Sequence, residues 1–201
     1  STPVGLYKKM IADHKTNGTS YKNAITFNLD EYVGLPRNHE QSYYTFMHDN
    51  LFNEIDVPEE NIHIPNGEAD DPEAECVRYE SEMAKYVVDV QILGIGSDGH
   101  IAFNEPGAAF DSLTHTMELT EQTRKDNARF FGGDIEQVPT LAITQGLGTI
   151  MRAKKIILIA TGANKADAVY GMIKGPKTTE CPASILQDHP DVTVILDEEA
   201  A

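Results

Sequence analysis

Three side chains that can exchange protons stand close together in one short segment of this chain. Asp98 and His100 are two residues apart, and Glu105 follows five residues later. A histidine titrates near neutral pH, and a carboxylate held against one of its ring nitrogens fixes its tautomer and raises its basicity. The segment follows an apolar run over 87–95 that we expect to form a strand. This pattern predicts a proton-transfer relay at the end of a strand.

The glycines of the same segment allow two other interpretations. Gly94, Gly96 and Gly99 match the G-x-G-x-x-G pattern of dinucleotide-binding loops. That motif needs a helix that continues past its third glycine, whereas Pro106 follows soon after. Asp98 would also place a negative charge where a pyrophosphate should lie. A structural glycine turn, with the histidine as a core residue, stays open on this segment alone.

Asp30 is a second candidate for proton transfer. It ends an apolar run over 24–29 and is followed by Glu31, which must point to the other side of an extended chain. Burial in a partly dry crevice raises the pKa of a carboxyl group toward the range that suits proton abstraction. The alternative is a turn aspartate that bonds to its own backbone.

Two cations are candidates for binding a phosphate. Lys165 follows an apolar run over 155–160 and lies in the expected first turn of a helix that Asn164 could cap. The free N–H groups and positive dipole end of a helix N-terminus favour anions, so a lysine there makes a natural phosphate site. Arg129 is flanked by apolar residues that could bury its stem.

The elements that must position these residues alternate between helix and strand. The sequence predicts helices over 4–14, 39–52, 72–86, 139–152, 164–173 and 182–186, and strands over 24–29, 61–65, 87–95, 155–160 and 192–196. The stretch 107–137 is polar and weakly periodic. Apolar strands separated by helices indicate an α/β fold, with a mostly parallel, open doubly wound (Rossmann-like) sheet covered by helices on both faces. Ligands bind outside the carboxyl ends of such strands, so the three candidate loops should converge on one crevice.

Composition restricts the class of protein. The 201 residues suit one domain, and a net charge of -16 argues against nucleic acid or an anionic membrane as a partner. No apolar run approaches the length of a membrane span. Cys76 and Cys181 stand alone, and the other histidines show no metal-ligand spacing, so we expect free thiols, no metal and a reducing cytoplasm.

Two long motifs give a more specific indication. Residues 28–36 read Asn-Leu-Asp-Glu-Tyr-Val-Gly-Leu-Pro, and residues 94–106 read Gly-Ile-Gly-Ser-Asp-Gly-His-Ile-Ala-Phe-Asn-Glu-Pro. They resemble the two signature stretches of the glucosamine-6-phosphate deaminase family, and the resemblance runs over 1–201. The related 6-phosphogluconolactonases share the Asp-Gly-His turn but continue differently over 101–106 and lack the Asp-Glu-Tyr stretch.

The resemblance implies an activity in amino-sugar catabolism. The family converts glucosamine 6-phosphate and water to fructose 6-phosphate and ammonia, without a metal or an organic cofactor. By motif, Asp30 would shuttle a proton between C2 and C1, and His100 would open the pyranose ring. Asp98 and Glu105 would orient and charge that histidine.

The resemblance also implies the position of the substrate phosphate. Arg129 and Lys165 would form the clamp, and Ser1 and Thr2 would belong to the end of a glycine-rich phosphate loop. The strand, helix and strand that precede this loop in the family are absent. We therefore expect one α/β domain over 1–201 that lacks its N-terminal βαβ unit. Whether the protein is a monomer or a homo-oligomer is undecided at this point.

Two other activities compete with the deaminase. A hydrolase of the 6-phosphogluconolactonase type would use the histidine to activate water and would have no use for Asp30. A non-catalytic sugar-phosphate sensor would keep Lys165 and Arg129 and let the relay decay, but Asp98, His100 and Glu105 are all present.

The allosteric branch of the family places basic residues just after the Asn-Glu-Pro motif, to hold the phosphate of N-acetylglucosamine 6-phosphate. Here residues 107–117 contain no lysine or arginine. We predict that this acetylated sugar does not change how the reaction rate depends on the concentration of glucosamine 6-phosphate. A sigmoidal rate curve that becomes hyperbolic when the sugar is added would contradict the prediction.

Overall fold

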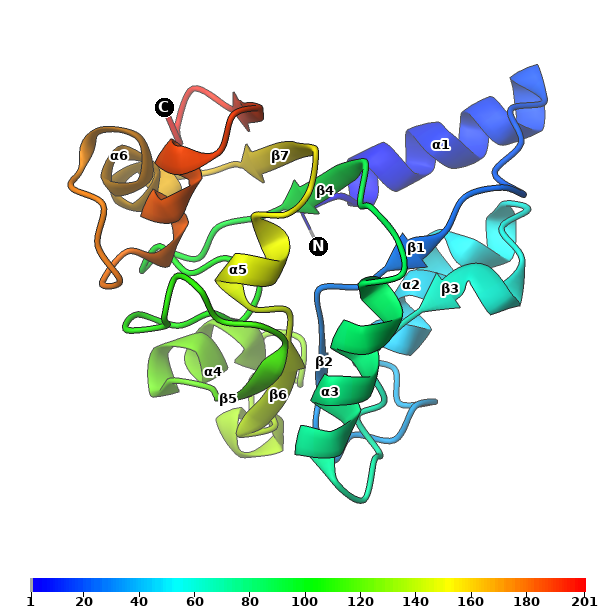
Figure 1. Ribbon diagram of the computed structural model, residues 1–201, viewed down its shortest axis with the longest axis horizontal. Helices are drawn as coiled ribbons and strands as arrows, with labels where there is room; N and C mark the ends of the chain where they lie inside the picture. The colour runs from blue at the N-terminus through cyan, green and yellow to red at the C-terminus, as the bar shows by residue number, and fades with distance from the viewer. Residues whose placement is uncertain (1) are drawn as a thin grey trace.

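Parallel strands form two separate sheets in the computed structural model, which describes residues 2–201 (Figure 1). β1 (Thr26–Phe27) pairs with β3 (Ile62–His63). β7 (Lys155–Ala160) lies between β4 (Val90–Leu93) and β8 (Val192–Leu196) and is parallel to both. Alternate residues of β7 are buried and those between them are partly exposed, so one face of this sheet is covered more completely than the other. The predicted α/β fold with mostly parallel strands is confirmed.

A third sheet is antiparallel, which the sequence analysis did not predict. β6 (Leu141–Thr144) lies between β2 (Asp30–Tyr32) and β5 (His115–Glu118). The helix predicted over 139–152 is therefore wrong: its first half is β6, and only α5 (Leu147–Ile150) is helical. A short buried apolar run has no hydrophobic periodicity that distinguishes a helix from a strand. Here residues 141–144 form a strand because they pair with β2 on one side and β5 on the other.

Five further α-helices lie within residues 2–201, and three of them begin at a capping side chain. They are α1 (Val4–Asn17), α2 (Tyr43–Asn50), α3 (Pro72–Met83), α4 (Glu121–Ala128) and α6 (Ala166–Lys174). Ser42, Asp71 and Thr120 cap α2, α3 and α4, each accepting a hydrogen bond from the third backbone N–H that follows it. The helix predicted over 39–52 thus begins at Tyr43, four residues later than predicted. Short 3-10 helices cover Phe52–Glu54, Glu59–Asn61, Ile135–Gln137, Ala163–Lys165 and Pro182–Asp188.

The elements fall into two halves in Figure 1. α1, α2 and α3 gather with β1 and β3 on one side, and α4, α5 and α6 with β5, β6 and β7 on the other. The largest core cluster packs β4 and β7 against α5, α6 and the Pro182–Asp188 helix. No helix within residues 2–201 combines the length and apolar character needed to cross a membrane.

Buried amides join the parallel β4 side to the antiparallel sheet. Gln145 follows β6, and its side-chain amide donates to the carbonyl of Asn28 at 3.0 Å. Asn104 donates from its side chain to the carbonyl of Gln145 at 2.8 Å. The backbone N–H of Phe103 donates to Oγ1 of Thr144 at 3.1 Å. These bonds hold the loop after β4 against the strand that pairs with β2.

Glu80 of α3 forms a second junction. Its carboxylate accepts from the backbone N–H and Oγ1 of Thr114 at 3.1 and 2.5 Å and from Oγ1 of Thr149 at 2.9 Å. It also pairs with Arg152. The carboxylate therefore ties α3 to the start of β5 and to α5.

We predict that Glu80→Ala lowers the free energy of unfolding by about 2–4 kcal/mol, because three partly buried donors lose their acceptor. Glu82→Ala on the same helix is the control, since its ion pair with Lys85 lies at the surface and should leave stability nearly unchanged. Urea denaturation followed by circular dichroism measures both. Equal losses in the two variants would show that the junction adds nothing.

Candidate active site

A cavity of about 800 Å³ runs along β4 and past the ends of β1 and β4. Five of the residues that the sequence analysis singled out line it: Thr2, Asp30, His100, Arg129 and Lys165. They come from the N-terminal segment, β2, the loop after β4, the end of α4 and the start of α6. Ser1, the other residue expected in the phosphate loop, lies outside the described residues.

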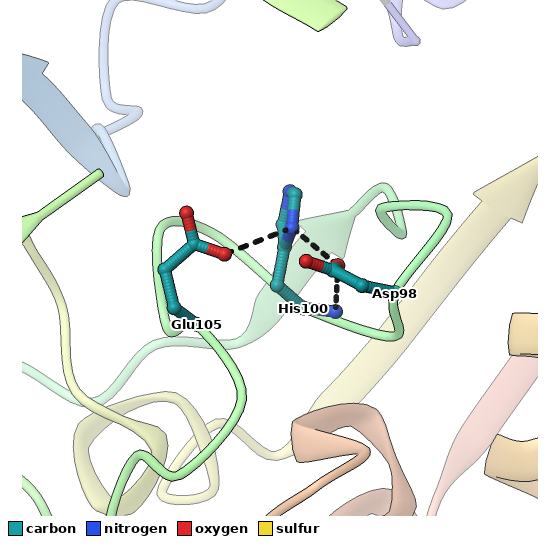
Figure 2. Close-up of side chains that lie close together, drawn as sticks. All are labelled: Asp98, His100 and Glu105. Atoms are coloured by element: carbon teal, nitrogen blue, oxygen red, sulfur yellow. Dashed lines mark hydrogen bonds and ion pairs between the residues drawn. The ribbon is translucent and has the colours of Figure 1, made fainter. Parts of the chain in front are cut away.

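The side chains of Asp98, His100 and Glu105 meet at one ring nitrogen (Figure 2). Nδ1 of His100 lies 2.7 Å from Oδ1 of Asp98 and 3.5 Å from Oε2 of Glu105. The backbone N–H of His100 also donates to Oδ1 of Asp98, at 3.1 Å. Two carboxylates beside Nδ1 favour a proton on that nitrogen, which leaves Nε2 as the basic one. The ring can therefore accept or release a proton through Nε2.

Glycines shape the turn that carries this cluster. A Cβ on Gly96 would lie 2.2–2.6 Å from ring atoms of His100, so only glycine leaves room for the imidazole. Gly99 has φ +86°, in the left-handed region that favours glycine. Gly99 is followed by a turn closed by a bridge between Ile101 and Asn104, not by the helix that a dinucleotide site needs. The glycines therefore serve to seat the histidine.

The two carboxylates of the cluster differ in their surroundings. Burial by itself would raise the pKa of Asp98, but the His100 ring and backbone N–H outweigh it and lower that pKa to about 2. Asp98 therefore stays charged at neutral pH. Glu105 is almost completely buried, and its Oε1 accepts from the backbone N–H and Oγ1 of Thr120 at 3.2 and 3.3 Å. Thr120 caps α4, so Glu105 contacts both the histidine and the start of a helix.

Asp30 opens β2, where it pairs with Thr144, and does not end the preceding strand as expected. Burial, and next the negative charge of Glu31, raise the pKa of Asp30 to about 7, while the nearby His100 acts in the opposite direction. A carboxyl group that titrates near neutral pH can both take up and return a proton at working pH. The geometry is that of a second acid/base group facing the same cavity.

Glu31 fixes the strand that carries this carboxyl group, a role that the sequence analysis missed. Its carboxylate is buried and accepts from the backbone N–H groups of Tyr32, Tyr43 and Tyr44 at 2.9, 3.0 and 2.9 Å. It thereby joins β2 to the first turn of α2. The signal was available in the alternation of the strand: if Asp30 faces the crevice, Glu31 faces the interior, and a buried carboxylate needs donors.

Two cations stand at another part of the cavity wall. Arg129 ends α4, with its guanidinium 4.7 Å from the ring centre of Phe130. Lys165 is itself the N-cap of α6, so the expected cap at Asn164 is wrong. Burial and the neighbouring Arg129 lower the pKa of Lys165, whereas Asp126 and Asp98 act against this. Two like charges this close favour an anion between them, as a phosphate would be.

The fold and this site define a class of protein. The chain belongs to the family of glucosamine-6-phosphate isomerases and 6-phosphogluconolactonases, whose sequence profile matches residues 1–195. Two relatives carry a more particular name. A glucosamine-6-phosphate deaminase of Thermoanaerobacter pseudethanolicus is 54% identical over 202 residues, covering 100% of this chain and 79% of that protein. A glucosamine-6-phosphate deaminase of Halalkalibacterium halodurans is 52% identical over 200 residues, covering 99% and 81%.

Solved structures agree with this assignment. A monomeric glucosamine-6-phosphate deaminase matches with a TM-score of 0.97 and 47% identity, over 100% of this chain and 83% of that one. A 6-phosphogluconolactonase from Trypanosoma cruzi matches with a TM-score of 0.79 and 23% identity, over 100% and 80%. At that identity the second likeness concerns the fold alone.

The raised pKa of Asp30 predicts a cost in stability. The folded pKa is about 7 and the unfolded value is near 3.8, so the folded state binds more protons than the unfolded state between these values. Stability contributed by this group therefore falls as pH rises from about 4 to about 7. We predict that Asp30→Asn raises the melting temperature by about 2–6 °C at pH 8.

The gain should shrink at pH 5, where the native carboxyl group is protonated. Scanning calorimetry at both pH values measures it, with Asp89→Asn as a surface control that should change little. A gain of equal size at pH 5 and pH 8 would contradict the assigned cause.

Proposed function

We propose that this chain converts glucosamine 6-phosphate and water to fructose 6-phosphate and ammonia. The observation that carries the proposal is the meeting of two separate acid/base groups, Asp30 and His100, with a pair of cations in one cavity. An isomerisation needs one base over the C1–C2 edge of the sugar and another acid/base group at the ring oxygen. A lactone hydrolysis needs only the second.

The cations would hold the substrate through its phosphate. Arg129 lies close enough to lower the pKa of Lys165, and Thr2 lies beside Gly94 at the wall of the same cavity. Binding at the phosphate holds the sugar in register with groups that act several bonds away. These cations make no contribution to proton transfer.

His100 would open the pyranose ring. Its Nε2 takes the proton from the C1 hydroxyl and returns it to the ring oxygen as the C1–O bond to that oxygen breaks, which yields the open aldehyde. Asp98 and Glu105 act through the imidazole as positioning residues: they hold its orientation and stabilise the cation that forms on the ring. Their negative charges lie beside Nδ1, so the positive charge on the imidazolium is compensated.

Asp30 would then move a proton from C2 to C1. Removal of the C2 proton by Asp30, while the C1 aldehyde oxygen takes a proton from the substrate's ammonium group, gives an enolamine. Return of the C2 proton from Asp30 to C1 then places the double bond between C2 and nitrogen, as an iminium with a C1 hydroxyl. Water adds to this iminium carbon, and ammonia leaves to give the ketone of fructose 6-phosphate. A carboxyl group with a pKa of about 7 suits both halves of the transfer.

We predict ammonium release from glucosamine 6-phosphate, and a loss of about 10²–10⁴-fold in kcat for Asp30→Asn. A coupled assay for ammonium measures the rate, and isothermal titration with fructose 6-phosphate tests whether the variant still binds. Asp89→Asn, which changes a carboxylate at the amino end of β4 in the same cavity, is the control and should keep full activity.

Hydrolysis of 6-phosphogluconolactone is the competing activity, and acid release from the lactone measures it. Lactone hydrolysis that survives Asp30→Asn, together with no ammonium release, would replace the deaminase with a hydrolase. Tight binding of the sugar phosphate without turnover of either substrate would indicate a sensor. The cytoplasmic location also stays a prediction; it is supported by Cys76 and Cys181, both of which are free thiols.

A further inference from the structure

Asp98, His100 and Glu105 each offer one possible metal-ligand atom, a carboxylate oxygen from each acid and a ring nitrogen from the histidine. These three atoms lie within 4.8 Å of one another. Two of these atoms, Nδ1 of His100 and Oε2 of Glu105, are fully buried and make no hydrogen bond. The side chain of Glu105 is only 4% exposed, and Figure 2 shows its carboxylate directed at the imidazole. A buried carboxylate oxygen without a donor is costly unless a proton or a cation reaches it.

Both carboxylate contacts at Nδ1 of His100 are ion pairs and not well-directed hydrogen bonds. The Asp98 oxygen is only 2.7 Å from Nδ1, and yet it lies off the direction in which an N–H would point. An ion on the lone-pair direction of Nδ1 would instead have both carboxylate oxygens beside it. With bonds of about 2.05 Å, the distances of 2.7 and 3.5 Å subtend angles of about 80° and about 115° at the ion. Both lie in the range of distorted tetrahedral to octahedral coordination.

We propose that Asp98, His100 and Glu105 bind a divalent transition-metal ion, with Zn²⁺ as the preferred ion, and that the bound ion inhibits the enzyme. An imidazole with two carboxylates suits Zn²⁺, whereas Mg²⁺ and Ca²⁺ require six or more oxygen ligands. Water or substrate oxygen completes the coordination. The net charge of -16 raises the local concentration of divalent cations.

Hydrogen bonds from neighbouring residues already orient the two carboxylate ligands. Oε1 of Glu105 is held by the backbone N–H and hydroxyl of Thr120, and Oδ1 of Asp98 by the backbone N–H of His100. Contacts of this kind fix ligand geometry and strengthen metal binding in proteins. They also reduce the entropy lost when the ion binds, because the side chains are ordered in its absence.

Inhibition follows from the atom that the ion occupies. An ion on Nδ1 takes the place of the proton on that nitrogen, and it neutralises the charge of the two carboxylates. The basicity of Nε2 then falls, and His100 loses the proton transfer that ring opening requires. Only this inhibition rests on the proposed function; binding of the ion does not depend on it.

The test uses the chelator-treated chain and measures binding separately from activity. Isothermal titration with Zn²⁺ should give one site per chain with a dissociation constant in the micromolar range, and Glu105→Gln should weaken it by at least about tenfold. Co²⁺ as a second probe should give visible d–d absorption without a thiolate-to-metal charge-transfer band. Asp98→Asn is the second ligand variant, and circular dichroism verifies that both variants fold.

Cys181→Ser and His115→Asn are the matched controls and should bind Zn²⁺ as the parent does. The Cys181 sulfur packs against Gly99 and is the thiol beside this loop, and His115 lies in β5. Binding that survives both ligand variants, or that is lost in either control, would overturn the site.

Activity is measured in parallel, because the two proposals can fail separately. Zn²⁺ binding that depends on Glu105, in a chain that releases no ammonium, would leave the metal site standing and refute the proposed function. Ammonium release unaffected by saturating Zn²⁺ would refute the inhibition.

Discussion

The buried carboxylate of Glu105 is the interaction on which the site depends. One of its oxygens faces Nδ1 of His100, and the other accepts from Thr120 at the start of α4. α4 ends eight residues later, where Arg129 forms its C-cap. A single side chain therefore joins the acid/base group on the loop after β4 to the helix that carries a candidate phosphate ligand. Removal of either contact would leave a buried charge without its partner, which is why the two regions are constrained together.

Charge is distributed unevenly in this acidic chain, and that distribution gives the site its properties. Glu31 accepts from three backbone N–H groups, which lower its pKa and partly offset the rise that burial causes. Asp30 has burial and a negative neighbour instead, and its pKa rises to about 7. Two adjacent carboxylates thus differ in function because their donors differ. In this way carboxyl side chains supply both a hydrogen-bonded anchor and a titrating group.

The sequence predicted the elements and residues that local physics determines. β7 and β8 match their expected ranges, because each is a mostly apolar run bounded by polar residues. The loop of Asp98, His100 and Glu105 follows a strand as expected, whereas Asp30 opens β2 and Lys165 is itself the N-cap of α6. The relatives confirm the family. β6 was missed because its pairing partners are far away in sequence, and a buried run carries no period that identifies a strand. The three donors of Glu31 were missed for a similar reason, since Tyr43 and Tyr44 reach it only through the turn before α2.

The two acid/base groups of the cavity belong to different sheets. Asp30 lies on the antiparallel sheet through its pairing with Thr144, and His100 lies on the loop that leaves the parallel sheet at β4. The side-chain amides of Asn104 and Gln145 join the two sheets through hydrogen bonds, and these bonds help to fix the separation of Asp30 and His100. The two sheets thus carry the two acid/base groups of the cavity, and a pair of buried side-chain amides holds the sheets at a fixed distance from each other. The placement of the two acid/base groups relative to the sugar then depends on the rigidity of the protein interior. Residues that do not contact the substrate therefore control how precisely these groups are positioned.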